Sequence, residues 1–85
     1  MKIVYSDEFR KQFHTLPVRV QNLCHKQEAI FQQNWKDSRL HGKKLADHNL
    51  AFSFRITRRY RVLFIFTDAQ TVLFVTIGHR KDVYR

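Results

Sequence analysis

Two apolar runs near the end of the chain constrain the fold more than any other feature. They cover residues 62–66 and 72–77, and both are rich in β-branched and aromatic side chains. Runs of this length and composition are typical of strands buried in a sheet. The first follows Arg58-Arg59-Tyr60-Arg61, and the second leads into Gly78-His79-Arg80-Lys81. The sequence therefore predicts two buried strands with cationic ends, an arrangement suited to binding a polyanion.

The overall charge narrows the choice of partner. The chain has 85 residues, with 16 Lys and Arg against 7 Asp and Glu, which gives a formal charge of +9. At this length we expect one domain spanning residues 1–85, and a hydrophobic content of 44% is enough for one core. A strongly basic domain attracts nucleic acid, an acidic protein or an anionic membrane surface.

A membrane is the weakest of these three partners. The apolar runs are far shorter than the roughly 20 residues of a spanning helix, and Asp7 and Glu8 come too early for a signal peptide. Cys24 is the single cysteine, so no disulfide framework is expected and a cytoplasmic location fits. His41 and His48 lack a cysteine or a close second ligand, so we predict no metal site and no other cofactor.

Capping and turn residues divide the rest of the chain. Residues 2–5 are a short strand candidate, and Ser6 can cap a helix that opens with two acidic residues. Pro17 suits the first turn of a second helix. Periodicity is lost over residues 34–49, where Gly42 appears among basic residues, so we expect a basic loop. The predicted fold class is α+β, with an N-terminal strand and a helical hairpin packed on a small, mainly antiparallel, twisted sheet.

Strand register predicts which side chains meet, because side chains alternate between the two faces of a sheet. If residues 50–56 pair with the following strand so that the apolar faces coincide, Arg55 falls opposite Arg61 on the other face. Continuing through a tight connection places Thr67 opposite Thr71. Two arginines are thus expected to share one face.

The same register extends to the last strand. It puts Phe64 beside Phe74 under the helices and Ile77 next to Arg61. His79 then lies diagonally from Arg61, about 7–8 Å away by ordinary sheet spacing. The sequence therefore predicts a histidine close to the paired arginines.

Each of these residues also has a simpler interpretation. An arginine on a strand is usually solvated, and for Arg55 this is as reasonable as a functional role. Arg61 begins an otherwise apolar strand, where a charge is costly unless it faces water or an anion, which favours function. Gly78 is a predicted bulge or bend, so side-chain alternation cannot place Arg80 or Tyr84 beyond it.

Three segments follow the strand, the helical hairpin and the basic loop. They are Phe52-Ser53-Phe54-Arg55-Ile56, Tyr60-Arg61-Val62-Leu63-Phe64 and Ile77-Gly78-His79-Arg80-Lys81-Asp82-Val83-Tyr84. In this order they resemble the RelE/ParE superfamily of bacterial toxins, over nearly the whole chain. The resemblance implies the toxin of a type II toxin–antitoxin system, which in the RelE branch cleaves mRNA, commonly in the ribosomal decoding site. In the ParE branch the same fold instead poisons DNA gyrase.

The resemblance also implies roles for particular residues. Arg61 matches the strand arginine of RelE-like nucleases, Arg80 the arginine after the glycine, and Tyr84 the tyrosine near the C-terminus. His79 is similar to a histidine that some ribonuclease members use. Lys43 and Lys44 do not align with the catalytic lysines of RelE and are only near them in the chain.

Cleavage of RNA through its own 2′-hydroxyl requires a proton acceptor, cations around the phosphorus and an acid for the leaving oxygen. We assign His79 as general base or acid, Arg61 and Arg80 as clamps on the transition state, and Tyr84 as a stacking platform or second acid. The expected RNA-binding residues are Lys43, Lys44, Arg55, Arg58, Arg59, Lys81 and Arg85.

Together with this chemistry, the resemblance implies a metal-independent endoribonuclease that cleaves mRNA, either at the ribosome or free of it, and is held inactive by an acidic antitoxin. Two alternatives remain open. One is a ParE-like gyrase inhibitor, and the other is a protein of the same fold that only binds nucleic acid or an antitoxin, without catalysis.

Overall fold

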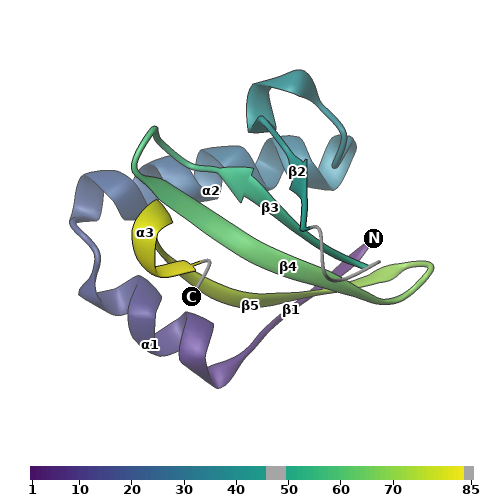
Figure 1. Ribbon diagram of the computed structural model, residues 1–85, viewed down its shortest axis with the longest axis horizontal. Coiled ribbons are helices and arrows are strands. Elements are labelled where there is room, and N and C mark those ends of the chain that lie inside the picture. The colour runs from purple at the N-terminus through teal and green to yellow at the C-terminus, as the bar shows by residue number, and fades with distance from the viewer. Residues whose placement is uncertain (46–49, 84–85) are drawn as a thin grey trace.

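The computed structural model describes residues 1–45 and 50–83. Its elements are β1 (Lys2–Tyr5), α1 (Asp7–Thr15), α2 (Val18–Gln33), the 3-10 helix η1 (Ser38–Leu40), β2 (Lys43–Lys44), β3 (Ala51–Arg55), β4 (Tyr60–Asp68), β5 (Thr71–His79) and α3 (Arg80–Val83) (Figure 1). The five strands form one sheet in the order β1-β5-β4-β3-β2. Strand β1 runs parallel to β5, and the other neighbours are antiparallel. The predicted α+β class is confirmed.

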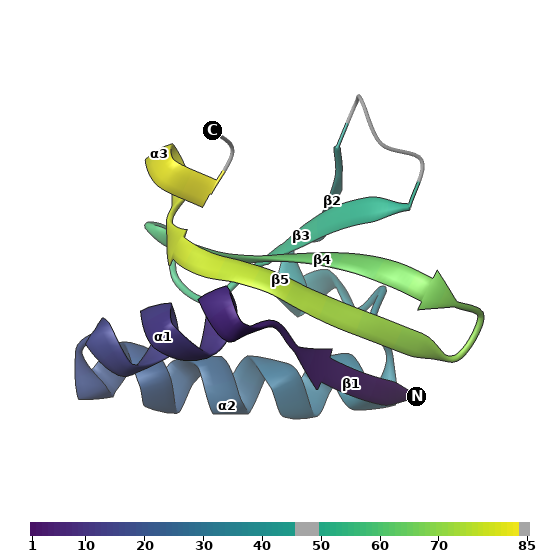
Figure 2. The same ribbon diagram turned by 90° about the horizontal axis from the view of Figure 1, so that it is seen from below.

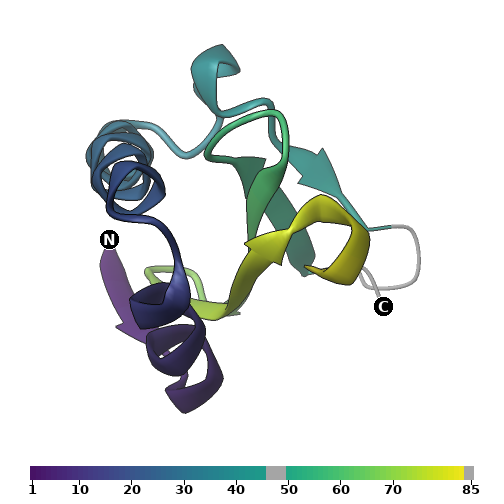
Figure 3. The same ribbon diagram turned by 90° about the vertical axis from the view of Figure 1, so that its left-hand side faces the viewer.

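The molecule has two unequal sides. Helices α1 and α2 cover one face of the sheet, and the short helix α3 lies on the other (Figures 2 and 3). We call these the helix face and the open face. Within residues 1–45 and 50–83, no helix is both long and apolar enough to cross a membrane.

The helical hairpin forms where the capping residues predict it. The Ser6 hydroxyl accepts a hydrogen bond from the backbone N–H of Phe9 at 2.9 Å, so α1 begins with a capped first turn. Pro17 precedes α2 and takes the place of a side-chain cap. The Gln21 amide donates to the Leu16 carbonyl at 3.0 Å and ties the two helices together.

Phe31 of α2 is the centre of the core. It is fully buried, and its ring centroid lies 5.3 Å from Phe54, 4.9 Å from Phe64 and 5.4 Å from Phe74. These three phenylalanines come from β3, β4 and β5, so a single side chain joins α2 to the three central strands. Aromatic pairs in such tilted and edge-on arrangements stabilise beyond the area they bury.

The prediction of a loop over residues 34–49 is wrong for the described part of that segment. Asp37 accepts a hydrogen bond from the backbone N–H of Arg39 at 2.9 Å and begins η1. His41 then adopts a left-handed conformation with φ of 47°, which turns the chain back so that β2 pairs with β3. Residues 46–49, which include His48, lie outside the described residues.

The register agrees with the sequence prediction in the middle of the sheet. Arg55 lies opposite Arg61, and Phe64 lies opposite Phe74, as expected. Towards the β4–β5 turn the register shifts, because Asp68 rather than Thr67 lies opposite Thr71.

A second shift lies at the other end of β5. Leu63 pairs with Thr76, but Phe64 pairs with Phe74, so Val75 is an extra residue on β5. The buried residues of β5 accordingly change their spacing from two to three at Val75: Val72, Phe74 and Ile77. The predicted neighbour of Arg61 was Ile77, and this is wrong: Gly78 lies opposite Arg61.

Polar side chains of the N-terminal region hold this bulge. The Ser6 hydroxyl donates to the Val75 carbonyl at 2.6 Å. The side-chain oxygen of Gln12 accepts from the hydroxyl of Thr76 and from the backbone N–H of Ile77. Strand β1 pairs only with Thr71–Phe74, so these contacts satisfy an edge of β5 that no strand covers.

Replacing Phe64 with alanine tests the aromatic core. Phe64 is 1% exposed, and we expect Phe64→Ala to lower the free energy of unfolding by about 3–5 kcal/mol through lost packing. That is a large part of the roughly 5–15 kcal/mol of a typical domain. Thermal and urea unfolding measure the change. The control is Val18→Ala, at a side chain that is 69% exposed, for which we expect a change within about 0.5 kcal/mol. Equal effects of the two substitutions would contradict this description of the core.

Candidate functional site

Arg55 and Arg61 form a like-charged pair across β3 and β4. Their strand neighbours Phe54 and Val62 are buried in the core on the helix face, so side-chain alternation places the two arginines on the open face. Among the described residues, Arg55 Nε and Arg61 Nη1 are buried and have no hydrogen-bond acceptor.

Such a pair is unfavourable without a ligand. Like charges directly across a sheet repel, and a buried donor without an acceptor costs about 1–3 kcal/mol. A phosphate group between the guanidinium groups would remove both penalties, since it supplies negative charge and several acceptors. The geometry therefore favours an anion-binding site at the Arg55–Arg61 pair.

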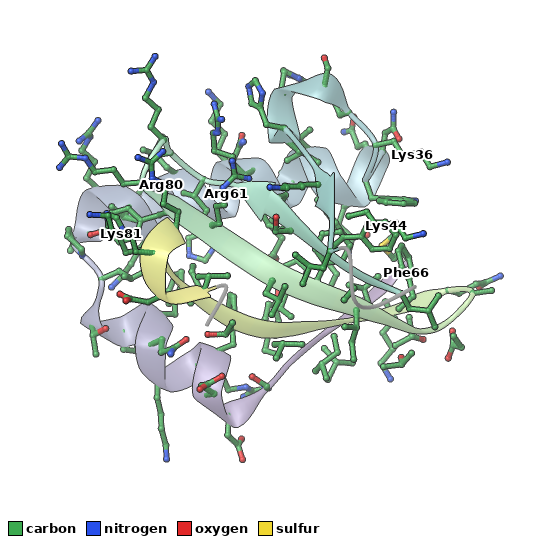
Figure 4. The ribbon with its side chains drawn as sticks, viewed as in Figure 1. Lys36, Lys44, Arg61, Phe66, Arg80 and Lys81 are labelled. Atoms are coloured by element: carbon green, nitrogen blue, oxygen red, sulfur yellow. The ribbon has the colours of Figure 1, made fainter. Side chains whose placement is uncertain are left out.

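Helix α3 brings a third arginine to this end of the sheet. The backbone N–H of Arg80 donates to the Arg59 carbonyl at 2.6 Å, which fixes the start of α3 two residues from Arg61. A Cβ added at Gly78 would meet the Val83 side chain at 3.7 Å, an ordinary van der Waals contact, so α3 packs closely over this position of β5. Figure 4 shows the side chains of Arg61, Arg80 and Lys81 at the same end of the molecule.

The structure places His79 differently from the sequence prediction. The extra residue in β5 puts His79 opposite Tyr60 rather than diagonal to Arg61. Its ring stands edge-on to Tyr60 at 6.0 Å between centroids, and its Nδ1 accepts from the backbone N–H of Lys81 at 3.2 Å. His79 lines a hollow at the β5 edge together with Gln12 and other residues of the helix face. The predicted closeness of the histidine to Arg61 on one face is therefore wrong.

Three of the remaining predicted residues lie next to this cluster in the chain, and Lys43 lies on the edge strand β2. Arg58 and Arg59 are exposed in the turn between β3 and β4, where the Thr57 hydroxyl accepts from the backbone N–H of Arg59. Lys81 is exposed on α3. Lys43 lies opposite Ser53, which alternation places on the Arg55 side of the sheet.

Two further site predictions cannot be placed, because Tyr84 and Arg85 lie outside the described residues. Lys44, by contrast, lies opposite Phe52 and therefore faces the other way from Lys43. The two lysines thus lie on opposite faces at the edge of the sheet.

The structure also adds residues that sequence reasoning missed. Tyr60 contacts His79, and Gln12 reaches the same edge of β5. Tyr60 belongs to a segment that the sequence singled out, so its alternation with Arg61 was a usable signal. Gln12 carried no signal, because its partners lie more than 60 residues away in the chain.

The described part of the chain contains neither a cluster of metal-ligating residues nor an exposed cysteine. No three residues among its His, Cys, Asp and Glu come close enough together to hold a metal ion. Cys24 is 1% exposed, and its burial raises the pKa of the thiol to about 12, so the side chain is a neutral core residue at physiological pH.

No protein-family model matches the sequence, and neither does any curated protein sequence. Solved structures do match over nearly the whole chain. A chain of the RelB–RelE antitoxin–toxin complex from Methanococcus jannaschii has a TM-score of 0.78 at 19% identity, covering 95% of this chain and 94% of its own. The chain has the RelE-like toxin fold.

Two further structures share this fold. A chain of the Escherichia coli DinJ–YafQ complex has a TM-score of 0.80 at 15% identity, with 99% and 98% of the two chains covered. A chain of the RelBE2 toxin–antitoxin complex from Mycobacterium tuberculosis has a TM-score of 0.66 at 26% identity, with 93% and 96% covered. The RelE-like fold expected from the sequence resemblance is thus confirmed.

Removing one arginine of the pair should stabilise the RelE-like domain. We expect Arg61→Gln to raise the free energy of unfolding by about 0.5–2 kcal/mol in buffer of low anion content, because repulsion and an unsatisfied charged donor are relieved. Sulfate should raise the melting temperature of the unsubstituted protein more than that of the variant.

The control for this experiment is Arg19→Gln, at an exposed arginine of α2 on the helix face. It should change neither the stability in low-anion buffer nor the response to sulfate. A lower melting temperature for Arg61→Gln in low-anion buffer would show that Arg61 stabilises the free protein, against the interpretation given above.

Proposed function

We propose that this protein is a toxin that cleaves mRNA at the ribosome, without a metal, through attack by the 2′-hydroxyl of the RNA. The observation that carries the proposal is the pairing of Arg55 and Arg61 on the open face, with Arg55 Nε and Arg61 Nη1 buried and without an acceptor. The RelE-like fold supports it, since the sequence resemblance to this superfamily implies mRNA cleavage in one of its branches.

The arginines account for the electrostatic part of the reaction. As the 2′-oxygen attacks phosphorus, negative charge builds up on the phosphoryl oxygens, and guanidinium groups held in place before the reaction stabilise it without reorganisation. Arg61 and Arg80 act on this charge in the proposal, and Arg55 positions the phosphate. Arg58, Arg59 and Lys81 bind neighbouring phosphates, as do Lys43 and Lys44 at the sheet edge.

Proton transfer is assigned to His79 and Tyr84. A neutral imidazole that accepts a hydrogen bond at Nδ1, as His79 does from the backbone N–H of Lys81, carries its proton on Nε2. General acid catalysis requires the imidazolium form, in which both ring nitrogens are donors, so His79 must release the Lys81 N–H to take up the proton that it gives to the leaving oxygen. His79 does not lie beside Arg61 on one face of the sheet, because alternation places the two side chains on different faces. Proton transfer by His79 therefore needs its own test.

Induction in cells separates the proposed activity from gyrase inhibition. We expect expression of the protein to stop protein synthesis rapidly and to produce cut mRNA, while plasmid supercoiling stays unchanged. Arg61→Ala should abolish growth inhibition, since the variant loses the phosphate contact but keeps its core. The matched control is Arg19→Ala, at an exposed arginine of α2 on the far side of the sheet, which should stay fully toxic.

The outcomes have distinct meanings. Loss of supercoiling with intact mRNA would select the ParE-like alternative. Full toxicity of Arg61→Ala would remove the arginine pair from the mechanism. His79→Ala, measured as the rate of RNA cleavage against pH, should lose one arm of the profile if His79 transfers a proton.

We also propose that an acidic antitoxin covers the open face. The similar chains from M. jannaschii and E. coli were solved in complexes with antitoxins. Here the open face is cationic at Arg61 and apolar further along β4, where Leu63 and Ile65 alternate onto the same face and are half-buried. A segment with both carboxylates and apolar side chains fits this face.

Salt dependence tests the antitoxin proposal. We expect the affinity for the cognate antitoxin to fall as ionic strength rises, because ion pairs at the rim are screened. Arg55→Glu should weaken binding strongly by repelling the acidic segment. Lys11→Glu, at an exposed position of α1, makes the same charge change on the helix face and should bind normally. An affinity that is flat with salt, or equal effects of the two substitutions, would place the antitoxin elsewhere.

A further inference from the structure

A second hollow lies at the edge of the sheet next to β2, and its volume is about 360 Å³. This volume lies within the range of pockets that bind small ligands. Trp35 and Phe52 form an aromatic wall, with ring centroids 5.2 Å apart in an edge-on arrangement. Both side chains are only half-buried, so their rings combine contact with the core and access from the hollow.

The rim of this hollow is positively charged. Lys36, His41 and Lys44 line it and are exposed. Lys36 Nζ lies 5.2 Å from the centroid of the Trp35 ring. The one carboxylate among the described lining residues is Asp37, which is held by Arg39 in two side-chain hydrogen bonds of 2.9 and 3.0 Å.

Asp37 therefore does not offset the charge of the lysines. Its hydrogen bonds with Arg39 lower the pKa of the carboxyl to about 2, so it remains ionised and paired at neutral pH. The hollow thus combines an aromatic wall with a cationic rim.

The backbone at the rim is strained at His41. Its φ of 47° is in the left-handed region, which glycine adopts without penalty and other residues rarely enter. Glycine stands at the next position, Gly42, where no positive φ is found. Strain of this kind concentrates at functional sites, and here it holds an imidazole at the mouth of the hollow.

We propose that this hollow binds one nucleotide of an RNA strand, with the base against Trp35 and Phe52 and the phosphate on Lys44 and its cationic neighbours. Aromatic side chains beside a cationic track bind single-stranded nucleic acid without base pairing, because every base has a π-face. The proposal extends the proposed function by giving the RNA strand a second contact, and its ligand rests on that function.

The two anion sites are connected along β3. Phe52 and Arg55 are three residues apart on the strand, about 10 Å. On the edge strand β2, Lys43 lies opposite Ser53 and Lys44 opposite Phe52, and both line the hollow. Alternation places Lys43 on the same face as Arg55, so positive charge continues from the open face to the hollow. In Figure 4, Lys36 and Lys44 lie at one end of the molecule and Arg61 and Arg80 at the other.

Tryptophan fluorescence, excited at a wavelength that tyrosine does not absorb, reports on this hollow, because Trp35 is the single tryptophan. The protein is titrated separately with AMP, GMP, CMP and UMP, which have no internucleotide bond to cleave, and the signal is corrected with a free tryptophan derivative. We expect saturable quenching by at least one mononucleotide and none by ribose 5-phosphate. Equal responses to mononucleotides and ribose 5-phosphate, or no saturation, would overturn the proposal in favour of a general anion site or no site.

Three variants locate the binding. Lys44→Ala should weaken mononucleotide binding by about two- to fivefold, and Lys26→Ala, at an exposed lysine of α2 that does not line the hollow, should not. His41→Gly suits the left-handed backbone, so it should fold at least as stably while binding more weakly than the unsubstituted protein. Unchanged affinity in both Lys44→Ala and His41→Gly would exclude the hollow as the nucleotide site.

A trinucleotide with 2′-O-methyl groups, which resists cleavage, separates this proposal from the proposed function. It should bind more tightly than a mononucleotide, and Arg61→Ala should reduce its affinity to that of the mononucleotide while leaving mononucleotide quenching unchanged. If Arg61→Ala abolishes mononucleotide quenching as well, the binding belongs to the arginine site and the hollow has no part in it. If quenching persists in a protein that cleaves no RNA, the hollow stands and the nuclease proposal fails.

Discussion

The packing of Phe31 against three strands decides what the rest of the molecule can do. One helix side chain contacts Phe54, Phe64 and Phe74 at once, so the middle of the helix face of β3, β4 and β5 is used for the core. In a domain of 85 residues a single core must supply most of the stability. The opposite face is therefore released from core packing and can hold charged side chains that weaken the free protein. The cationic cluster is possible because the aromatic core stabilises the sheet from one side.

The bulge at Val75 is the second constraint on the site, because it determines which residue of β5 lies opposite Arg61. Without it Ile77 would lie beside Arg61, and with it Gly78 does, which gives α3 room to pack over the open face. The bulge depends on Ser6, whose hydroxyl both caps α1 and donates to the Val75 carbonyl. The N-terminal segment thus controls the geometry of the site from the opposite face of the sheet.

The sequence was sufficient to predict strand pairing where the hydrophobic pattern allowed only one register. Arg55 opposite Arg61 follows from making the apolar faces of two strands coincide, since a slip by one residue would expose Phe54 and Val62. The apolar run of β5 does not define a register in this way. Val75 is as apolar as its neighbours, so the hydrophobic pattern does not reveal that it is an extra residue in the strand. Its hydrogen-bond partner lies 69 residues earlier in the chain. The pairing of β2 with β3 could not be predicted either. It depends on the left-handed conformation of His41, which the amino-acid composition of the segment does not indicate.

The arginine pair and His41 have one property in common, which is that each destabilises the free protein. The two arginines repel each other and each has a buried donor without an acceptor, and His41 has a strained backbone conformation. Each cost falls on the free protein, and for the arginine pair a bound anion would remove it. Part of the binding energy of such a ligand would then come from relief of this instability. Folding alone would select against such residues, since a neutral side chain at Arg61 and a glycine at His41 would both be less costly. Their presence at the two ends of one cationic path is explained if a polyanion contacts both.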